Sequence, residues 1–176
     1  MNQKALRITQ TAALTALLIA LQALTRPAGQ LVTGSCVNAV LALSVLLAGI
    51  WSGAAVALLS PLFAFLLGIG PQLLPIIPAI AAGNLVYTAL LWALVRRRKG
   101  APPSRQIPAW LLSALGKSAA LYLIVVQVLC RVLPLKQPQI DTFSAMFSWP
   151  QLVTALLGGA IALVLAPLLE QAVRRR

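Results

Sequence analysis

The sequence predicts an all-α integral membrane protein with six transmembrane helices and cytoplasmic N- and C-termini. The 176 residues are 60% hydrophobic and only 9% charged, with a mean hydropathy of +0.93. Soluble domains average about 45–50% apolar and about 25% charged residues. The 14 Lys and Arg residues lie in short clusters between long apolar runs, as is typical of membrane proteins. One crossing needs about 20 apolar residues, so we expect a single six-helix domain over residues 1–176 and no sizeable soluble domain.

Helix breakers separate the first three apolar segments. The first segment ends at Arg26-Pro27-Ala28-Gly29, and the second passes into the third near Trp51-Ser52-Gly53. The third segment ends before a stretch that contains Pro71, Pro75 and Pro78. Proline and glycine interrupt helices because they remove a backbone donor or add backbone freedom. The predicted helices are 8–24, 31–50 and 51–70.

Basic and polar stretches separate the last three segments. The fourth ends at Arg96-Arg97-Arg98-Lys99, and a short loop with Pro102, Pro103 and Arg105 leads to the fifth. A polar stretch, 133–148, precedes the sixth, which ends at Arg174-Arg175-Arg176. The predicted helices are 79–95, 108–132 and 149–169.

The distribution of basic residues predicts the orientation. With the N-terminus inside, ten Lys and Arg residues lie on the inner side and three on the outer side, while Lys117 lies within the membrane. Cytoplasmic loops carry an excess of Lys and Arg, so we expect both termini inside a bacterial-type cell membrane. The outer connections are then 25–30, 70–78 and 133–148. We interpret the last as a long outer loop and expect a ligand site to open on that side.

Polar side chains in the apolar segments and near the outer loop are the candidate binding residues. A polar group inside a membrane helix costs free energy unless it finds a partner. The partner is either a ligand or a neighbouring helix, and the sequence leaves this choice open. Two similar strings, Gln30-Leu-Val-Thr and Gln151-Leu-Val-Thr, begin helices at the outer face. The candidates are Gln30, Thr33, Asn38, Asn84, Tyr87, Asp141, Phe147, Trp149 and Gln151.

Lys117 has two interpretations. It lies about nine residues into the fifth segment, so its ammonium either snorkels to the inner surface or reaches into a cavity. We favour snorkelling. The string Gly116-Lys117-Ser118 resembles the end of a phosphate-binding loop, but that motif needs glycine where this chain has Leu111. We therefore expect no nucleotide site.

The composition excludes most enzymatic chemistry. The chain has no histidine, and its only acids are Asp141 and Glu170. General acid and base catalysis and most metal sites depend on those residue types. We expect no catalytic residues, no metal and no cofactor. Cys36 and Cys130 lie in apolar segments and are interpreted as buried thiols.

Small residues form a stripe on the first helix. Ala12, Ala16 and Ala20 repeat every four residues and so share one helix face. Such a face lets another helix pack closely, either within the chain or from a partner protein. Gly158-Gly159 in the last segment, with Ala155 and Ala162, is a similar but less specific surface.

Nearly the whole chain resembles the substrate-binding S component of energy-coupling factor (ECF) transporters. The resemblance rests on size, six helices, both ends inside and four local strings. The strings are Ala12-Ala-Leu-Thr-Ala-Leu-Leu-Ile-Ala20, Gln30-Leu-Val-Thr-Gly-Ser-Cys-Val-Asn38, Ser60-Pro-Leu-Phe-Ala-Phe-Leu-Leu-Gly-Ile-Gly-Pro71 and Gly83-Asn-Leu-Val-Tyr87. It implies a transport subunit, not an enzyme, that captures a vitamin or related micronutrient in an outward-facing pocket. A transmembrane coupling subunit and two ATPase subunits would be its partners, together with the lipid bilayer and without nucleic acid. In this family the stripe resembles the docking surface for the coupling subunit, so Ala16 and Ala20 are expected contacts and Ala12 an extension.

The substrate is only weakly indicated. The candidate residues suit an uncharged or zwitterionic ring system held by stacking and amide hydrogen bonds, while Arg26, Lys117 or Lys136 could meet an anionic group. A cobalamin-like corrinoid or a queuine-like base precursor is our suggestion, and riboflavin, folate and pantothenate stay open. The alternative to an S component is a stand-alone secondary transporter or channel subunit. Ion-coupled carriers usually need an acid or histidine within the membrane, and no helix centre here has one. A structural membrane subunit that binds no small molecule is a third interpretation.

Overall fold

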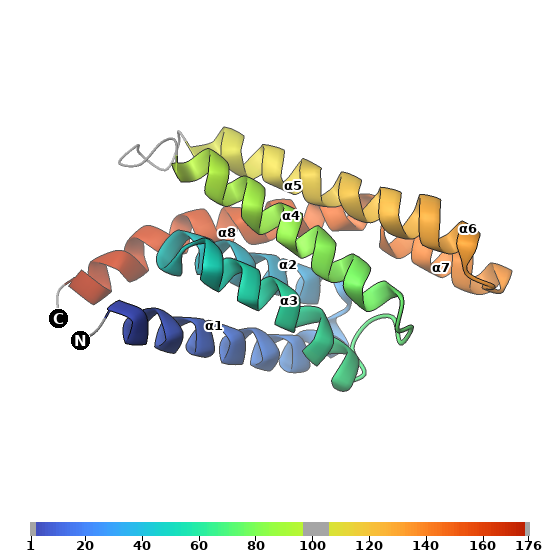
Figure 1. The fold of residues 1–176 in the computed structure, drawn as a ribbon, viewed down its shortest axis with the longest axis horizontal. Helices are drawn as coiled ribbons and strands as arrows, with labels where there is room; N and C mark the ends of the chain where they lie inside the picture. The colour runs from blue at the N-terminus through green and yellow to red at the C-terminus, as the bar shows by residue number, and fades with distance from the viewer. Residues whose placement is uncertain (1–2, 97–105, 175–176) are drawn as a thin grey trace.

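The computed structural model describes residues 3–96 and 106–174, and every element in these ranges is helical (Figure 1). The all-α membrane class predicted from the sequence is confirmed. Five helical stretches are long and apolar enough to cross a membrane, and a shorter apolar helix covers the remaining predicted segment. The elements are α1 (Gln3–Thr25), η1 (Arg26–Ala28), α2 (Gln30–Leu43), η2 (Ser44–Ala48), α3 (Ile50–Leu66), α4 (Ile76–Arg96), α5 (Ile107–Leu121), η4 (Tyr122–Leu129), α6 (Cys130–Val132), α7 (Gln137–Met146) and α8 (Trp149–Arg174).

The third helix is shorter than the predicted segment 51–70. It ends at Leu66, and two glycines follow with left-handed backbone angles, Gly68 at φ 67° and Gly70 at φ 75°. Residues with side chains rarely adopt this conformation, so glycine here turns the chain away from the helix. The prolines that were expected to end the segment lie beyond this turn.

The stretch 133–148 is mainly a helix, so the prediction of a long outer loop was wrong. Helix α7 occupies Gln137–Met146. Its start is stabilised because the Lys136 backbone N–H donates to Gln139 Oε1 at 3.0 Å. Pro138 lies in the first helical turn, where its missing N–H costs nothing. Polarity and proline content suggested a loop, although both also suit a short surface helix.

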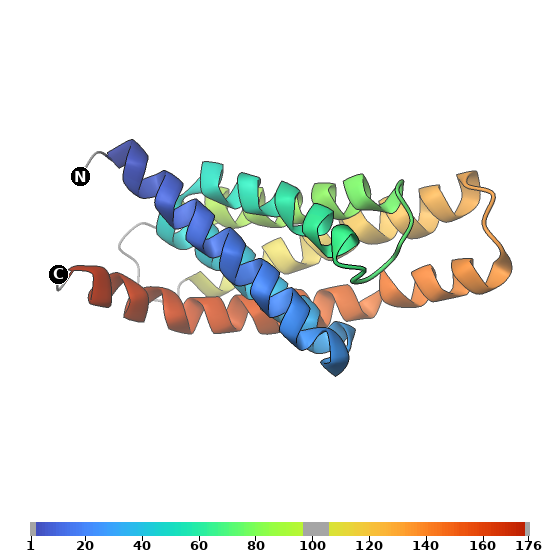
Figure 2. The same cartoon turned by 90° about the horizontal axis from the view of Figure 1, so that it is seen from below.

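The helices form a bundle around α2 and α4. Helix α2 packs against α8 and α1, and α4 packs against both α3 and α5. Figure 2 shows α1 lying obliquely across the other helices. The N- and C-termini lie at the same end of the molecule (Figures 1 and 2). This arrangement agrees with an even number of crossings, while the side of the membrane on which the termini lie stays a prediction.

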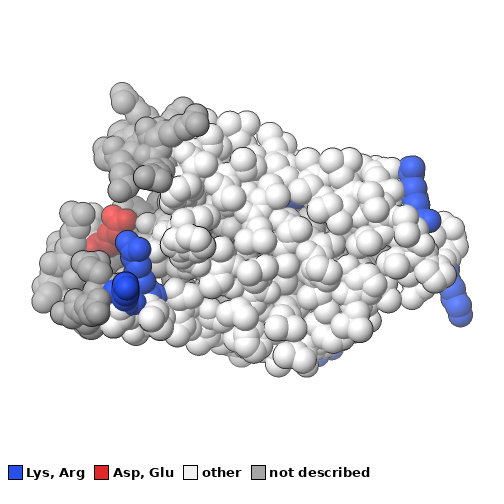
Figure 3. All heavy atoms as spheres, in the orientation of Figure 1, with Lys and Arg blue, Asp and Glu red and all other residues white. Residues whose placement is uncertain are grey.

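Charged side chains lie at the two ends of the bundle. Figure 3 shows Lys and Arg gathered at both ends of the long axis, with an almost entirely uncharged visible face between them. An uncharged face of this kind suits contact with the hydrocarbon layer of a bilayer. Several of the bases behind the predicted orientation lie outside the described residues: Arg97, Arg98, Lys99, Arg105, Arg175 and Arg176.

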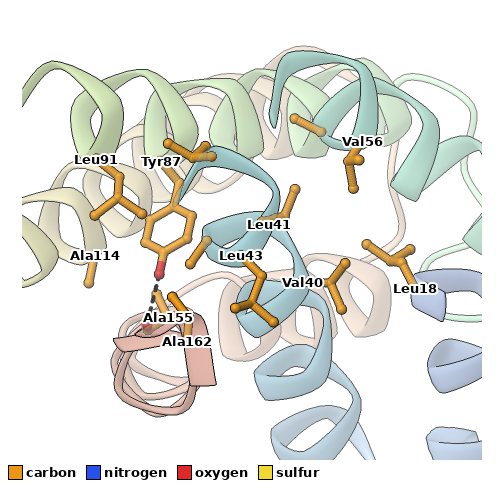
Figure 4. Close-up of a cluster of buried hydrophobic side chains, with 14 residues drawn as sticks. Leu18, Val40, Leu41, Leu43, Val56, Tyr87, Leu91, Ala114, Ala155 and Ala162 are labelled. Atoms are coloured by element: carbon orange, nitrogen blue, oxygen red, sulfur yellow. Dashed lines mark hydrogen bonds between the residues drawn. The ribbon is translucent and has the colours of Figure 1, made fainter. Parts of the chain in front are cut away.

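Two buried apolar clusters hold the bundle together. The larger one joins α1, α2, α3, α4, α5 and α8, and includes Leu18, Leu41, Val56 and Tyr87 (Figure 4). The second cluster contains Ile76, Ala79, Leu121, Val125, Cys130, Phe143 and Phe147. It joins the first turns of α4 to α5, η4, α6 and α7. Both cysteines are free; Cys130 is buried, as predicted, and Cys36 is half-buried.

Candidate functional site

Lys117 lies inside the bundle and is only 3% exposed. Its Nζ donates hydrogen bonds to Asn38 Oδ1 at 2.6 Å and to Asn84 Oδ1 at 2.7 Å. The same nitrogen lies 5.6 Å from the centre of the Tyr87 ring, within the range of a cation–π contact. Three residues predicted as binding candidates, Asn38, Asn84 and Tyr87, therefore surround one lysine.

The preference for a snorkelling Lys117 was wrong. Snorkelling requires a side chain on the lipid-facing side of its helix. Lys117 instead lies on the side of α5 that faces α2 and α4, where two amide oxygens take the place of water. The string Gly116-Lys117-Ser118 lies within α5, not in a loop between a strand and a helix.

The backbone fixes the orientation of the Asn38 amide. Asn38 Nδ2 donates to the Gly34 carbonyl at 2.9 Å and to Thr154 Oγ1 at 3.2 Å. Because the nitrogen is committed to these acceptors, the oxygen points toward Lys117. Thr154, which the sequence did not single out as a binding residue, thus links α8 to the cluster.

Proline provides the acceptor for the second amide. Asn84 Nδ2 lies 3.4 Å from the Ala57 carbonyl oxygen on α3. In a regular helix the N–H of residue 61 would bond to this oxygen, but Pro61 has no N–H. The freed carbonyl accepts from Asn84, so the Asn84 oxygen also faces Lys117. We call Lys117, Asn38, Asn84, Tyr87 and Thr154 the Lys117 cluster.

Tyr87 connects the cluster to α8. Its ring is completely buried, and its hydroxyl donates to the Ala155 carbonyl at 3.4 Å (Figure 4). Trp110 Nε1 donates to the same carbonyl, also at 3.4 Å. These contacts hold α4, α5 and α8 together around the lysine.

The two similar strings meet at one backbone oxygen. Gln30 Nε2 donates to the Met146 carbonyl at 2.7 Å, and Gln151 Nε2 donates to it at 3.1 Å. Thr33 is buried and donates to the Thr25 carbonyl at 2.9 Å, which joins α2 to the end of α1. The glutamines therefore fasten the corner between α7 and α8 to the start of α2.

The remaining three candidates lie apart from the Lys117 cluster. Asp141 is exposed on α7 and accepts a hydrogen bond from Gln137 Nε2 at 3.0 Å. Trp149 is 65% exposed, whereas Phe147 is buried beside Phe143 in the second apolar cluster. The nine predicted residues thus form three groups. One surrounds Lys117, one lies where the start of α2 meets the corner between α7 and α8, and the last consists of Asp141, Phe147 and Trp149.

The alanine stripe of α1 is exposed. Ala12, Ala16 and Ala20 are all exposed. Ala12 and Ala16 line an open apolar groove of about 620 Å³ between α1 and α3, together with Ile19, Trp51 and Leu59. By contrast, Ala155, Gly158, Gly159 and Ala162 on α8 are all buried. The second stripe therefore packs internally, and the first does not.

The fold is that of a multi-pass membrane protein, because five helical stretches are long and apolar enough to cross a membrane. The visible face in Figure 3 is almost uncharged between the two ends of the bundle. Residues 10–170 match the family model described as the ECF transporter, substrate-specific component. The chain belongs to this family, whose members are transport subunits and not enzymes. No curated protein and no solved structure matches the chain.

Proposed function

We propose that this protein captures a vitamin or related micronutrient on the outer side of a cell membrane and delivers it as part of an ECF-type importer. A transmembrane coupling subunit and two ATPases would supply the energy. Family membership supports the transport role. The observation that supports separate energising subunits is the exposed groove along α1. This groove offers a partner protein a smooth apolar surface on which to dock.

The groove suits a helix of the coupling subunit. Ala12 and Ala16 leave room for a close approach of another backbone, and Ile19 and Trp51 provide apolar contact on either side. Trp51 is 81% exposed in the isolated chain and lines the groove. Docking would cover it.

The substrate would bind near the predicted outer ends of α2, α4 and α8. The Lys117 cluster forms the polar part of this region, and the aromatic residues of the second cluster adjoin it through α5. We propose Gln30, Thr33, Asn38, Asn84, Tyr87, Asp141, Phe147, Trp149 and Gln151 as the pocket and its rim. A corrinoid or a queuine-like base remains our suggestion for the compound.

The test separates docking from capture. Ala16→Trp should abolish uptake by cells that carry the whole importer, because the indole would fill the groove. Substrate binding to the purified chain should stay within about threefold of the wild type. Ala13→Trp is the matched control, since Ala13 is also exposed on α1 but does not line the groove.

Two results would contradict the proposal. Equal loss of binding and uptake in Ala16→Trp would mean that the substitution disturbs the chain itself. Normal uptake in that variant would mean that the groove is not the docking surface. The same experiment with Ala20→Trp tests how far the surface extends toward the outer end of α1.

A further inference from the structure

We propose that the substrate carries an anionic group, such as a carboxylate, and that Lys117 binds it. This inference rests on the proposed function, since it takes the ligand of the bundle to be the transported compound. It narrows the substrate to acids, in place of the corrinoid or queuine-like base suggested above. It also assigns to Lys117 the anion-binding role that the sequence left open among Arg26, Lys117 and Lys136.

A charged Lys117 side chain in the bundle needs a counter-charge. An ammonium buried in an apolar environment is costly unless it is paired. The whole sequence contains two acids, Asp141 and Glu170. Asp141 is exposed and accepts from Gln137, and Glu170 is exposed near the end of α8. An ammonium at position 117 therefore has only neutral partners, and an anionic ligand would supply the charge that the chain lacks.

Lys117 can also donate one more hydrogen bond. A lysine ammonium has three donors, and two of them reach Asn38 Oδ1 and Asn84 Oδ1. Within the described residues the third N–H has no hydrogen-bond acceptor. Both amides are held by backbone carbonyls, so the lysine is positioned before any ligand arrives. Such preorganisation reduces the entropic cost of binding.

Apolar side chains lie next to Lys117 along α5. One turn further along α5, on the same face as Lys117, lies Leu121. Leu121 belongs to the second apolar cluster, together with Phe143 and Phe147. A molecule whose acid group binds Lys117 would therefore extend along α5 into apolar and aromatic side chains. The favoured substrate class is an amphipathic acid with an apolar or aromatic body.

The test uses pairs of compounds that differ only in charge. Nicotinate with nicotinamide, biotin with its primary amide, and pantothenate with panthenol are added to the full-length detergent-purified chain, together with neutral riboflavin. Binding is measured by isothermal titration calorimetry. We expect an acid of this panel to bind at least about 100-fold more tightly than its neutral counterpart, a difference of about 2.8 kcal/mol.

Three variants connect the preference to the lysine. Lys117→Gln keeps N–H donors for the two asparagine oxygens but removes the charge, so the fold should persist while the preference for the acid disappears. Lys117→Met is the second variant, and elution as a monodisperse species shows whether each variant is folded. Lys136→Met is the control, because Lys136 is exposed at the start of α7; it should retain the preference within about threefold.

The results that overturn the inference are distinct from those that overturn the proposed function. Tight binding of riboflavin or another neutral compound, unchanged in Lys117→Gln, would leave substrate capture intact but refute the anionic substrate. A loss of acid binding in Lys136→Met equal to that in Lys117→Gln would assign the effect to surface charge and refute the role of Lys117. A wild-type chain that prefers no acid over its neutral counterpart would refute the anionic substrate as well. Loss of the ATPase requirement for uptake would instead refute the proposed function and leave the role of Lys117 standing.

Discussion

Replacing Gly158 by alanine should separate α2 from α8 and destabilise the whole bundle. An added Cβ at this position would lie 2.5 Å from the Ser35 carbonyl oxygen and 2.6 Å from the Ala39 nitrogen. Ordinary contacts begin at 3.4 Å, so the two backbones must move apart by about 0.9 Å, which is 3.4 minus 2.5. A backbone cannot rotate out of the way as a side chain can.

The expected cost follows from two opposing effects. Overpacking of a well-packed core costs about 1–3 kcal/mol, and alanine gains about 1 kcal/mol over glycine inside a helix. Both of the closest contacts are to backbone atoms, so we take the upper part of the overpacking range, about 2–3 kcal/mol. The net loss is then about 1–2 kcal/mol, or a melting temperature lower by about 2–8 °C. The same movement would stretch the bond between Asn38 Nδ2 and Thr154 Oγ1 from 3.2 Å to about 4 Å. Substrate affinity should therefore fall as well.

The assay is thermal unfolding of the detergent-purified chain, followed by tryptophan fluorescence. Gly116→Ala is the matched control, because its Cβ would come too close only to the Cδ1 end of the Leu90 side chain, while its other neighbours lie at ordinary contact distances. That side chain can rotate, so the control should melt within about 2 °C of the wild type. A stable Gly158→Ala variant, or equal destabilisation of both variants, would refute the role of the close α2–α8 contact.

Three further predictions concern the polar groups of the bundle. Asn84→Ala and Gln151→Ala should each weaken substrate binding without loss of the purified monomer; unchanged affinity in titration calorimetry would remove that residue from the site. Pro61→Ala should restore the helical hydrogen bond from residue 61 to the Ala57 carbonyl, which would then compete with Asn84 Nδ2. Substrate affinity should fall while thermal stability does not. An unaltered substrate affinity would show that the freed carbonyl has no part in positioning Asn84. Gln22→Met should raise the free energy of unfolding by about 1 kcal/mol. Gln22 Oε1 is buried without a partner among the described residues, and Gln22 Nε2 reaches Ser60 only at 3.4–3.5 Å. A lower melting temperature would mean that these long hydrogen bonds stabilise the chain more than the unpaired oxygen destabilises it.

The sequence predicted the helices well because membrane burial imposes a simple pattern. Apolar runs near 20 residues, bounded by proline, glycine or arginine, correspond to α1, α2, α4, α5 and α8. It failed where that pattern is absent. Helix α7 is short and polar, so neither its length nor its hydropathy distinguishes it from a loop.

The site was harder to predict because it depends on contacts between distant residues. Polarity inside apolar segments identified Asn38, Asn84 and Tyr87, but spacing along the chain gave no reason to join them to Lys117. That connection needs the rotation of α5 about its axis, which only the packing of the bundle determines. The same is true of Pro61, which acts on Asn84 through a carbonyl of another helix.

The similarity between the Gln30 and Gln151 strings was informative in another way. Both glutamines lie at the starts of helices, and both donate to the Met146 carbonyl. The sequence placed them at one rim but could not reveal a shared acceptor. Similarly, the sequence could not show that the small residues of α8 are covered by α2, α4 and α5, whereas those of α1 are exposed.

The most direct test of the central claim is transport in reconstituted liposomes. The compound released from the gently purified chain is first identified by mass spectrometry, and its labelled form is then offered to two preparations. We predict ATP-dependent uptake when the chain is reconstituted with the coupling subunit and both ATPases, and no uptake with the chain alone. Uptake by the chain alone, without ATP, would contradict the account and identify a stand-alone transporter.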